Sequence, residues 1–334
     1  MRARDTDWDG VRLHVVTGKG GTGKTTVAAA LAVALASGGR KVLLIEVEGR
    51  QGIARLFDGP PLPYAERKVG IGLGQNGAPG GDVYALAVDP EGALLDYLEM
   101  FYGMRRTGQA LTRLGLVDFA TTIAPGLSDV LMTGKATEAT RRKAADRLIY
   151  DAVVMDAPPT GRIGRFLNVS VEVSGLAKVG PIRTHADSVA RVIRSPQTAV
   201  HLVTTLEEMP VQETLDGIAE LRALGVQLGG IFINMVRPGG LPDADLEAAA
   251  SGHADEAEIA LGLKAAGLSD SQALAAALGS ELAEHARGVA VQERERRELA
   301  AAGQPRYELP ALADGVDLGG LYRLAEVLRE QGAA

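Results

Sequence analysis

The feature that most constrains this chain is a glycine-rich segment near its start, GKGGTGKT at residues 18–25. It follows an apolar run, RLHVVT at 12–17, and precedes a helical pattern from about 24 to 37. In a loop between a strand and a helix, glycines let successive backbone N–H groups converge on a polyphosphate, and the helix N-terminus adds positive potential. With a second apolar run, KVLLIEV at 41–47, the segment predicts a phosphate-binding loop inside a βαβ unit.

The side chains of the loop indicate separate roles. Lys24 would reach the β and γ oxygens of a bound nucleotide, and the Thr25 hydroxyl would bind magnesium. The other residues that we expect to hold phosphate are Gly20, Gly21, Thr22, Gly23 and Thr26. A further lysine, Lys19, cannot easily share the phosphate position of Lys24, but it could reach the nucleotide of a facing subunit, as an arginine finger does. Lys19 therefore predicts a nucleotide-bridged dimer, and the alternative is a solvated loop lysine.

Further runs rich in Val, Ile or Leu have the length of strands, and helical patterns flank them. They are DVYALAVD at 82–89, YDAVVMDAP at 150–158, AVHLVTT at 199–205 and LGGIFINM at 228–235. Strands that are apolar on both faces belong inside a parallel sheet covered by helices. The sequence therefore predicts an α/β fold with a doubly wound, mostly parallel sheet of the P-loop NTPase type. YELP at 307–310 and a helix at about 317–331 would return to that sheet.

The remaining segments predict the domain organisation. Helical patterns fill most of 91–148, and the glycine-rich stretch at 70–81 is expected to be a mobile loop. Residues 241–303 lack strand patterns and indicate a helical insertion or cap. We expect one P-loop domain over 11–334, with 1–10 as a flexible tail and with about 90–148 and 241–303 as helical subdomain or cap segments.

One acidic residue ends an apolar strand beside the expected loop. Asp156 closes YDAVVMD, and ligands of open α/β sheets collect at the carboxyl ends of the strands. We expect its carboxylate to help hold magnesium, although an acid at this place can also cap a helix. In the segment Pro159, Thr160 and Gly161, the proline restricts the backbone and the glycine allows it to change conformation. The segment could therefore respond to the presence of a γ-phosphate. Thr160 could equally be a helix N-cap.

Composition removes several classes of function. The chain has no cysteine, which excludes disulfides, thiolate metal sites and cysteine nucleophiles. Its 35 basic against 42 acidic residues argue against a general nucleic-acid surface. The five histidines contain no i, i+4 pair, so a histidine-built metal site is not expected. No apolar run reaches the ~18 residues of a spanning helix, and the start does not resemble a signal peptide. We expect a cytoplasmic protein without stable membrane anchoring.

Four motifs together resemble the arsenite-pump ATPase (ArsA) family, which includes the guided-entry ATPase for tail-anchored proteins. They are KGGTGKTT at 19–26, KVLLI at 41–45, DAPPTGRIGRFL at 156–167 and VTTLEEMPVQET at 203–214. The chain is most similar to the actinobacterial anion-transporting-ATPase-type paralogues, which occur as paired genes. The resemblance covers most of 12–240 and, more weakly, 285–330, and it implies a single P-loop ATPase domain.

The resemblance also implies site residues. Lys24, Thr25 and Asp156 would hold Mg-ATP, and Lys19 would act across a dimer. Asn234 matches the family's adenine-binding Asn, although an Asn that ends a strand can also be a turn residue. Pro310 matches a region near the base. The implied cofactors are ATP or ADP and Mg²⁺.

The sequence departs from the family in two ways. Glu48 stands where the family has the Asp that orients the attacking water, and its longer side chain could make hydrolysis slow. Glu46 could be the base or a magnesium contact instead, and Gly49 and Arg50 complete this first switch segment. The alternative is two solvated glutamates. The family's metalloid-binding cysteines are missing, so metalloid transport is disfavoured and the protein client is unknown.

The expected function is a soluble, dimeric, Mg-dependent ATPase that acts as a nucleotide-driven conformational switch. Its partner would be a second copy or a paralogous ATPase of the same family. One alternative is a nucleotide-binding chaperone or scaffold with little hydrolysis. Another is a partitioning or cell-division ATPase.

Overall fold

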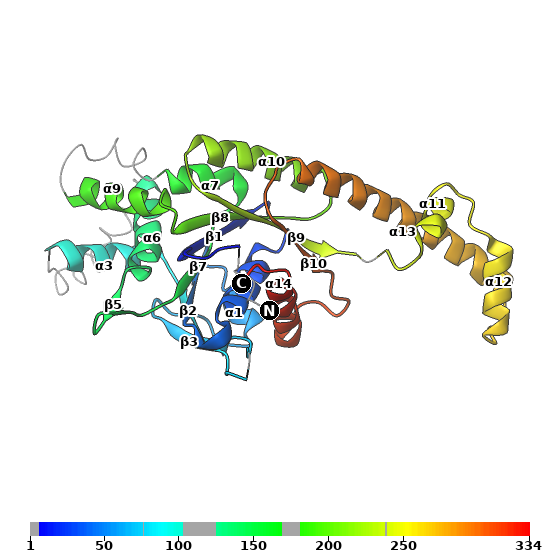
Figure 1. Cartoon of the computed structure of the whole chain (residues 1–334), viewed down its shortest axis with the longest axis horizontal. Coiled ribbons are helices and arrows are strands. Elements are labelled where there is room, and N and C mark those ends of the chain that lie inside the picture. Colours follow the sequence, from blue (N-terminus) through cyan, green and yellow to red (C-terminus); the bar gives the residue numbers. More distant parts are fainter. Residues whose placement is uncertain (1–6, 76, 103–124, 169–180, 238) are drawn as a thin grey trace.

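The computed structural model describes residues 7–75, 77–102, 125–168, 181–237 and 239–334. Its centre is an eight-stranded sheet in which only the pairing of the last two strands is antiparallel. The order across the sheet is β10 (Arg306–Pro310), β9 (Leu228–Val236), β8 (Thr198–Thr204), β1 (Leu13–Gly18), β7 (Ala152–Asp156), β2 (Val42–Glu46), β4 (Asp82–Ala87) and β3 (Arg67–Ile71). The predicted fold class is confirmed (Figure 1).

Helices cover both faces of this sheet (Figure 1). One face carries α1 (Lys24–Leu35), the short α2 (Gly52–Leu56) and α14 (Leu318–Glu330). The other carries α3 (Pro90–Tyr102), α6 (Pro125–Ala139), α7 (Thr160–Leu167), α9 (Pro181–Ile193) and α10 (Glu208–Ala223). A 3-10 turn, Ser37–Gly39, separates α1 from β2. The central strands are therefore buried from both sides, as their unbroken apolar runs predict.

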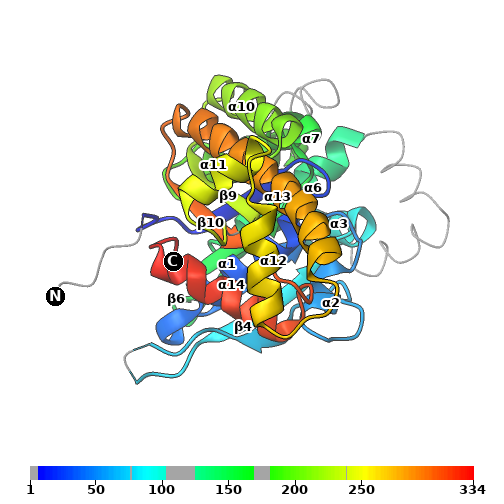
Figure 2. The ribbon, with the colours of Figure 1, turned by 90° about the vertical axis from the view of Figure 1, so that its right-hand side faces the viewer.

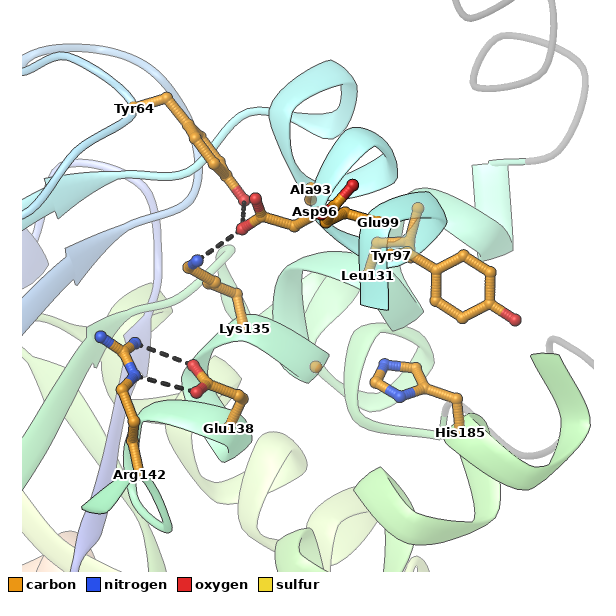
Figure 3. A pocket seen from close by; sticks show the side chains of 11 residues that line it. Tyr64, Ala93, Asp96, Tyr97, Glu99, Leu131, Lys135, Glu138, Arg142 and His185 are labelled. Atoms are coloured by element: carbon orange, nitrogen blue, oxygen red, sulfur yellow. Dashed lines mark hydrogen bonds and ion pairs between the residues drawn. The ribbon is translucent and has the colours of Figure 1, made fainter. Parts of the chain in front are cut away.

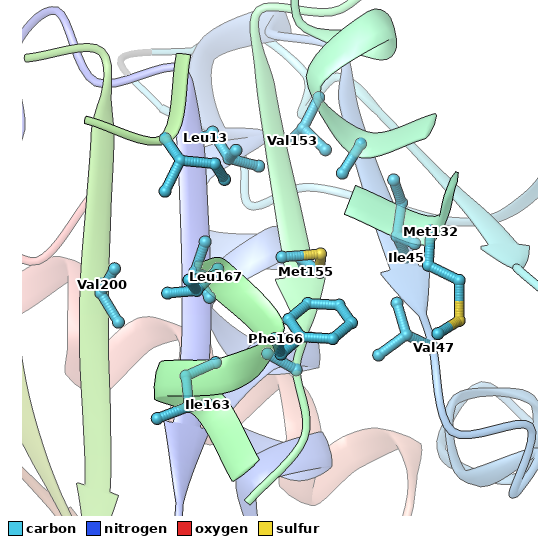
Figure 4. Close-up of a cluster of buried hydrophobic side chains, with 14 of the residues drawn as sticks. Leu13, Ile45, Val47, Met132, Val153, Met155, Ile163, Phe166, Leu167 and Val200 are labelled. Atoms are coloured by element: carbon cyan, nitrogen blue, oxygen red, sulfur yellow. The ribbon is translucent and has the colours of Figure 1, made fainter. Parts of the chain in front are cut away.

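Alternation along the strands divides the core into two layers. In β1, Leu13 and Val15 face the α7 and α10 side, whereas Val16 faces the α1 side. Figure 4 shows the first layer, where Phe166 of α7 packs against side chains of the central strands. On the opposite face, α1 is buried almost all round between the sheet and α14, which explains its alanine-rich, uniformly apolar sequence.

Three helices extend away from the β9 and β10 edge of the sheet (Figure 1). They are α11 (Asp243–Ala250), α12 (Glu256–Ala265) and α13 (Ser271–Ala300), and Figure 2 looks at the molecule from the side of this extension. The last part of α13 joins the main core through Leu299. In contrast, α12 packs on α13 and has no buried residue. The expected helical character of 241–303 is thus found, and its outer end stands clear of the sheet.

The stretch at 70–81, which was expected to be a mobile loop, holds the last two residues of β3 and then the loop that connects β3 to β4. The backbone N–H of Gly72 donates to Gly81 O at 2.7 Å, and Gln75 and Ala78 exchange two backbone hydrogen bonds. A Cβ on Gly81 would lie 1.8 Å from the carbonyl oxygen of Arg40. Glycine is needed here for close backbone approach rather than for mobility.

Two other segments differ from the structure that the sequence analysis predicts for them. The short strands β5 (Lys143–Ala144) and β6 (Arg147–Leu148) pair with each other inside the range that helices were expected to fill. Residues 103–124 of that range lie outside the described residues, as do residues 1–6 of the expected tail. Trp8 is buried in the core, and the Tyr307 hydroxyl donates to Asp7 Oδ2 at 2.6 Å. Asp7 and Trp8 of the expected flexible tail are therefore held against the sheet.

Candidate functional site

The glycine-rich loop connects β1 to α1 and is held by its own backbone. Gly21 and Gly23 have φ of 91° and 84°, in the range that favours glycine, and Gly23 is the N-cap of α1. The Thr22 hydroxyl donates to the Lys19 carbonyl at 2.9 Å. A Cβ on Gly20 or Gly21 would meet no atom within 4 Å, so this side of the loop faces open space. The loop therefore forms a cradle at the N-terminus of α1 that is wide enough for an anionic group.

Strand register brings the predicted magnesium ligands together. Asp156 lies opposite Val16 of β1 and opposite Glu46 of β2, so it sits beside the start of the loop. The Thr25 hydroxyl donates to Asp156 Oδ2 at 2.6 Å. A hydroxyl and a carboxylate are hard oxygen donors, and Mg²⁺ in nucleotide sites takes one or two such protein ligands together with phosphates and waters. These residues fit the ion that the sequence predicts.

A cavity of about 230 Å³ opens over this pair. The residues that line it share a position at the carboxyl ends of β1, β2 and β7 and are Gly21, Gly23, Lys24, Thr25, Glu46, Glu48, Arg50 and Asp156. Of the described residues, no group of three or more His, Asp or Glu side chains forms a metal site by itself.

Burial perturbs both charged groups at the bottom of the cavity. It raises the pKa of Asp156 to about 6, although the Thr25 hydrogen bond and the nearby Lys24 charge work in the opposite direction. Burial also lowers the pKa of Lys24, against the attraction of Asp156 and Glu48. Because both ions lack full solvation, a ligand that supplies opposite charges to each of them is favoured here.

The two glutamates after β2 have different surroundings. Glu46 is 2% exposed, and both of its carboxylate oxygens accept backbone N–H groups at the start of α2, from Gln51 and from Ile53. It therefore caps α2, a role that the sequence analysis did not predict. Glu48 faces the cavity and pairs with Arg50 at 3.4 Å, and Gly49 between them has φ of 64°. Glu48 is thus the carboxylate with more freedom toward a bound nucleotide.

The additional lysine of the loop is engaged within its own chain. Lys19 Nζ lies 2.8 Å from Glu213 Oε1 of α10, so it is not the solvated loop lysine considered above. The other oxygen of Glu213 accepts a hydrogen bond from the Thr160 hydroxyl at 3.4 Å. Thr160 is not an N-cap, because that position belongs to Pro159, while Gly161 is open to solvent. Glu213 lies inside the motif at 203–214, but nothing in the sequence indicates these contacts.

The two residues expected near a base line one cavity of about 870 Å³ next to the loop. Asn234 is buried at the end of β9, its Nδ2 donates to Thr22 O at 2.9 Å, and Pro310 is exposed at the end of β10. Thr26 connects this cavity to the phosphate loop. One of the two amide hydrogens is used by the loop, which leaves Asn234 with a second N–H donor and with Oδ1 as an acceptor. Part of the wall comes from α13, which the sequence analysis did not associate with the site: Glu281, Glu284, His285, Gly288, Val291 and Gln292.

A separate cavity of about 320 Å³ lies among α3, α6 and α9, away from the phosphate loop (Figure 3). On one side Asp96 accepts hydrogen bonds from the Tyr64 hydroxyl and from Lys135. On the other side Tyr97 and His185 meet edge to face at 5.6 Å. In Figure 3 the charged pairs, which include Glu138 with Arg142, therefore lie on one side of the cavity, and Tyr97 and His185 lie on the other.

Over the described part of the chain, no helix is both long enough and apolar enough to cross a membrane.

Comparisons with known proteins place these observations among relatives. The family model for anion-transporting ATPases matches residues 11–195. ATPase BagA of Mycobacterium tuberculosis is 52% identical over 324 residues, which are 97% of this chain and 94% of that protein. The arsenical pump-driving ATPase of Escherichia coli is 28% identical over 273 residues, covering 76% of this chain and 44% of that protein. ATPase GET3 of Podospora anserina is 27% identical over 209 residues, covering 61% of this chain and 56% of that protein.

Proposed function

This chain belongs to the anion-transporting ATPase (ArsA) family, and on that premise we propose that it is a Mg-dependent ATPase acting as a nucleotide-driven switch. The observation that carries the proposal is the convergence of Lys24, Thr25 and Asp156 on one cavity at the N-terminus of α1. Each supplies something that a metal-bound triphosphate needs: a cation for phosphate oxygens, a hydroxyl ligand and a carboxylate. We propose a single P-loop ATPase domain over 11–334 that includes the helical extension.

The second cavity supports adenine nucleotides as the ligand. It continues from the loop through Thr26 to Asn234 and Pro310, so phosphate and base would bind in adjoining spaces. Asn234 Oδ1 can accept from the exocyclic amine of adenine, and the remaining amide hydrogen can donate to the adjacent ring nitrogen. ATP is therefore the nucleotide that we propose.

Hydrolysis requires a group that orients a water molecule toward the γ-phosphate. We assign this role to Glu48, since it lines the phosphate cavity while both oxygens of Glu46 are bound by α2. A bound Mg²⁺ ion would neutralise charge on the transferred phosphoryl group. Lys24 and the loop N–H groups would hold the phosphates in place, and Asp156 would fix the Thr25 hydroxyl.

We propose that the catalytic unit is a dimer in which Lys19 reaches the nucleotide of the facing subunit. The partner is a second copy of this chain or a paralogous ATPase. The client would be a protein. Since the chain has no cysteine, a thiolate-bound metalloid is not among the candidates.

Glu48 also supports a second candidate, a nucleotide-binding scaffold with little turnover. One methylene longer than Asp, its side chain would place the carboxylate about 1 Å away from the position that Asp would occupy, and such a shift can slow a reaction about a hundredfold. Tight ATP binding with a rate that does not respond to Glu48→Gln would favour the scaffold.

The test compares wild type with Lys24→Ala and with Lys264→Ala as a surface control on α12. ATP binding is measured by calorimetry and hydrolysis by phosphate release, both with and without Mg²⁺. We expect wild type and Lys264→Ala to bind and hydrolyse ATP and Lys24→Ala to lose most of both. Equal behaviour of all three proteins, or no ATP binding by wild type, would refute the proposal.

A further inference from the structure

Glu213 contacts both the additional lysine of the phosphate loop and the start of α7. One carboxylate oxygen lies 2.8 Å from Lys19 Nζ, and the other accepts from the Thr160 hydroxyl at 3.4 Å. Glu213 itself belongs to α10, which carries neither the phosphate loop nor the segment after Asp156. Two parts of the nucleotide site are therefore joined through a third element.

The packing around this contact is close enough to transmit movement. A Cβ on Gly164 of α7 would lie 1.9 Å from Glu220 Oε1 of α10, so the two helices leave no room for a methyl group at that point. Thr160 is 5% exposed. The segment before it is fixed at its other end, because the Thr17 hydroxyl donates to Pro158 O at 2.7 Å. A shift of the first turn of α7 must therefore change the position of its neighbour on α10.

In this conformation Lys19 has its ion pair inside its own chain. While Lys19 is paired with Glu213, its ammonium group does not point toward a neighbouring molecule. In the proposed function, however, the same group contacts the phosphates of the nucleotide in the facing subunit. We propose that Glu213 is a positioning residue that holds Lys19 back until the start of α7 moves and a second subunit offers its nucleotide. This inference rests on the proposed function and adds a regulatory contact to it.

The exposure of the pair fits such a reversible contact. The Lys19 side chain is 29% exposed and that of Glu213 is 39% exposed, so solvent weakens their attraction. Exposed pairs of this kind shift an equilibrium by about two- to fivefold. A triphosphate carries more negative charge than one carboxylate and can therefore compete for the lysine.

The test measures dimerisation by sedimentation velocity with saturating Mg²⁺ and a non-hydrolysable ATP analogue. The Glu213→Gln variant keeps the size of the side chain and its hydrogen bond to Thr160 but removes the charge. We expect its dimer dissociation constant to fall about two- to fivefold below that of wild type. Asp216→Asn, three residues later on α10 and bonded only to Gln212 among the described contacts, is the matched control and should behave like wild type. Thermal midpoints of both variants check that they fold.

The Lys19→Met background separates the contact from general effects on α10. There the Glu213→Gln change should no longer alter dimerisation, because no ammonium is left to release. An unchanged dissociation constant in the single variant, or the same shift with and without Lys19, would overturn the inference while leaving the ATPase proposal intact. Failure of wild type to bind the analogue or to dimerise with it would instead overturn both.

Discussion

Replacement of Gly23 by Ala tests how the phosphate loop and the expected base site depend on each other. Gly23 has φ of 84° and ψ of 29°, a left-handed conformation that costs an alanine about 1–2 kcal/mol. A Cβ at this position would also lie 2.3 Å from Asn234 Nδ2. Asn234 would have to move and would release its hydrogen bond to the Thr22 carbonyl.

The size of the effect follows from these two contributions. Loss of a buried hydrogen bond that leaves its partner unsatisfied destabilises the fold by about 1–3 kcal/mol. In the opposite direction, alanine restricts the unfolded chain more than glycine does, which stabilises the fold by about 0.4–1 kcal/mol. We expect Gly23→Ala to lower the free energy of unfolding by about 2–4 kcal/mol. Gly21→Ala has a positive φ but open space around its Cβ, so about 1 kcal/mol is expected. Gly20→Ala has neither constraint and should be neutral or slightly stabilising.

The assay is urea unfolding of the nucleotide-free protein, followed by circular dichroism, for the three alanine variants and wild type. The order of stability should be Gly20→Ala, then Gly21→Ala, then Gly23→Ala. In an Asn234→Ala background the extra cost of Gly23→Ala over Gly21→Ala should disappear. The reasoning is refuted if Gly20→Ala is as destabilising as Gly23→Ala, or if that extra cost survives without Asn234.

Three further predictions concern pH, magnesium and the attacking water. Burial lowers the pKa of His14 to about 3 in the folded chain. Between about pH 3 and about pH 6.5, the imidazole of His14 therefore binds a proton only in the unfolded chain, and the free energy of unfolding decreases as the pH falls. His14 should account for a loss of about 2 kcal/mol from about pH 7.5 to about pH 5 in urea unfolding, and His14→Gln should remove this part. Thr25→Val should reduce Mg-dependent phosphate release on the order of a hundredfold, whereas Thr25→Ser, which keeps the hydroxyl, should retain most of it. Glu48→Gln should slow turnover by about 10²–10⁴ with ATP affinity, measured by calorimetry, within about threefold of wild type; an equal loss of affinity would contradict the assignment.

The central sheet could be predicted because its strands are buried on both faces. The runs that became β2, β7 and β9 are nearly continuous apolar segments of strand length, and their periodicity needs no tertiary information. β3 gives no such signal. It is a half-exposed edge strand that contains Gly70, and its pairing with β4 depends on backbone approaches that only the folded chain specifies.

In the candidate site, too, some residues could be predicted from the sequence and others could not. Residues joined by the local chemistry of the loop, such as Lys24 and Thr25, are identified by spacing alone, and a strand end indicates Asp156. Asn234 is implied only by the resemblance to the family. The functions of these residues stay predictions. The ion pair of Lys19 with Glu213 and the capping of α2 by Glu46 could not be predicted, because each depends on which element happens to lie beside a flexible carboxylate. The contribution of α13 to the larger cavity is likewise a consequence of tertiary packing.

The helix α13 is long enough that a small tilt at one end would move the other end by several ångströms. Its residues from Glu281 to Gln292 border the larger cavity, and the same unbroken helix continues outward to Ser271, where it supports α12. At 1.5 Å per residue, the distance from Gln292 to that outer end is about 30 Å. A tilt of about 10° at the cavity would therefore carry the outer end through about 5 Å. With a nucleoside in this cavity, as the proposed function requires, a small change in the fit of the ligand would give a larger displacement at the outer end of α13.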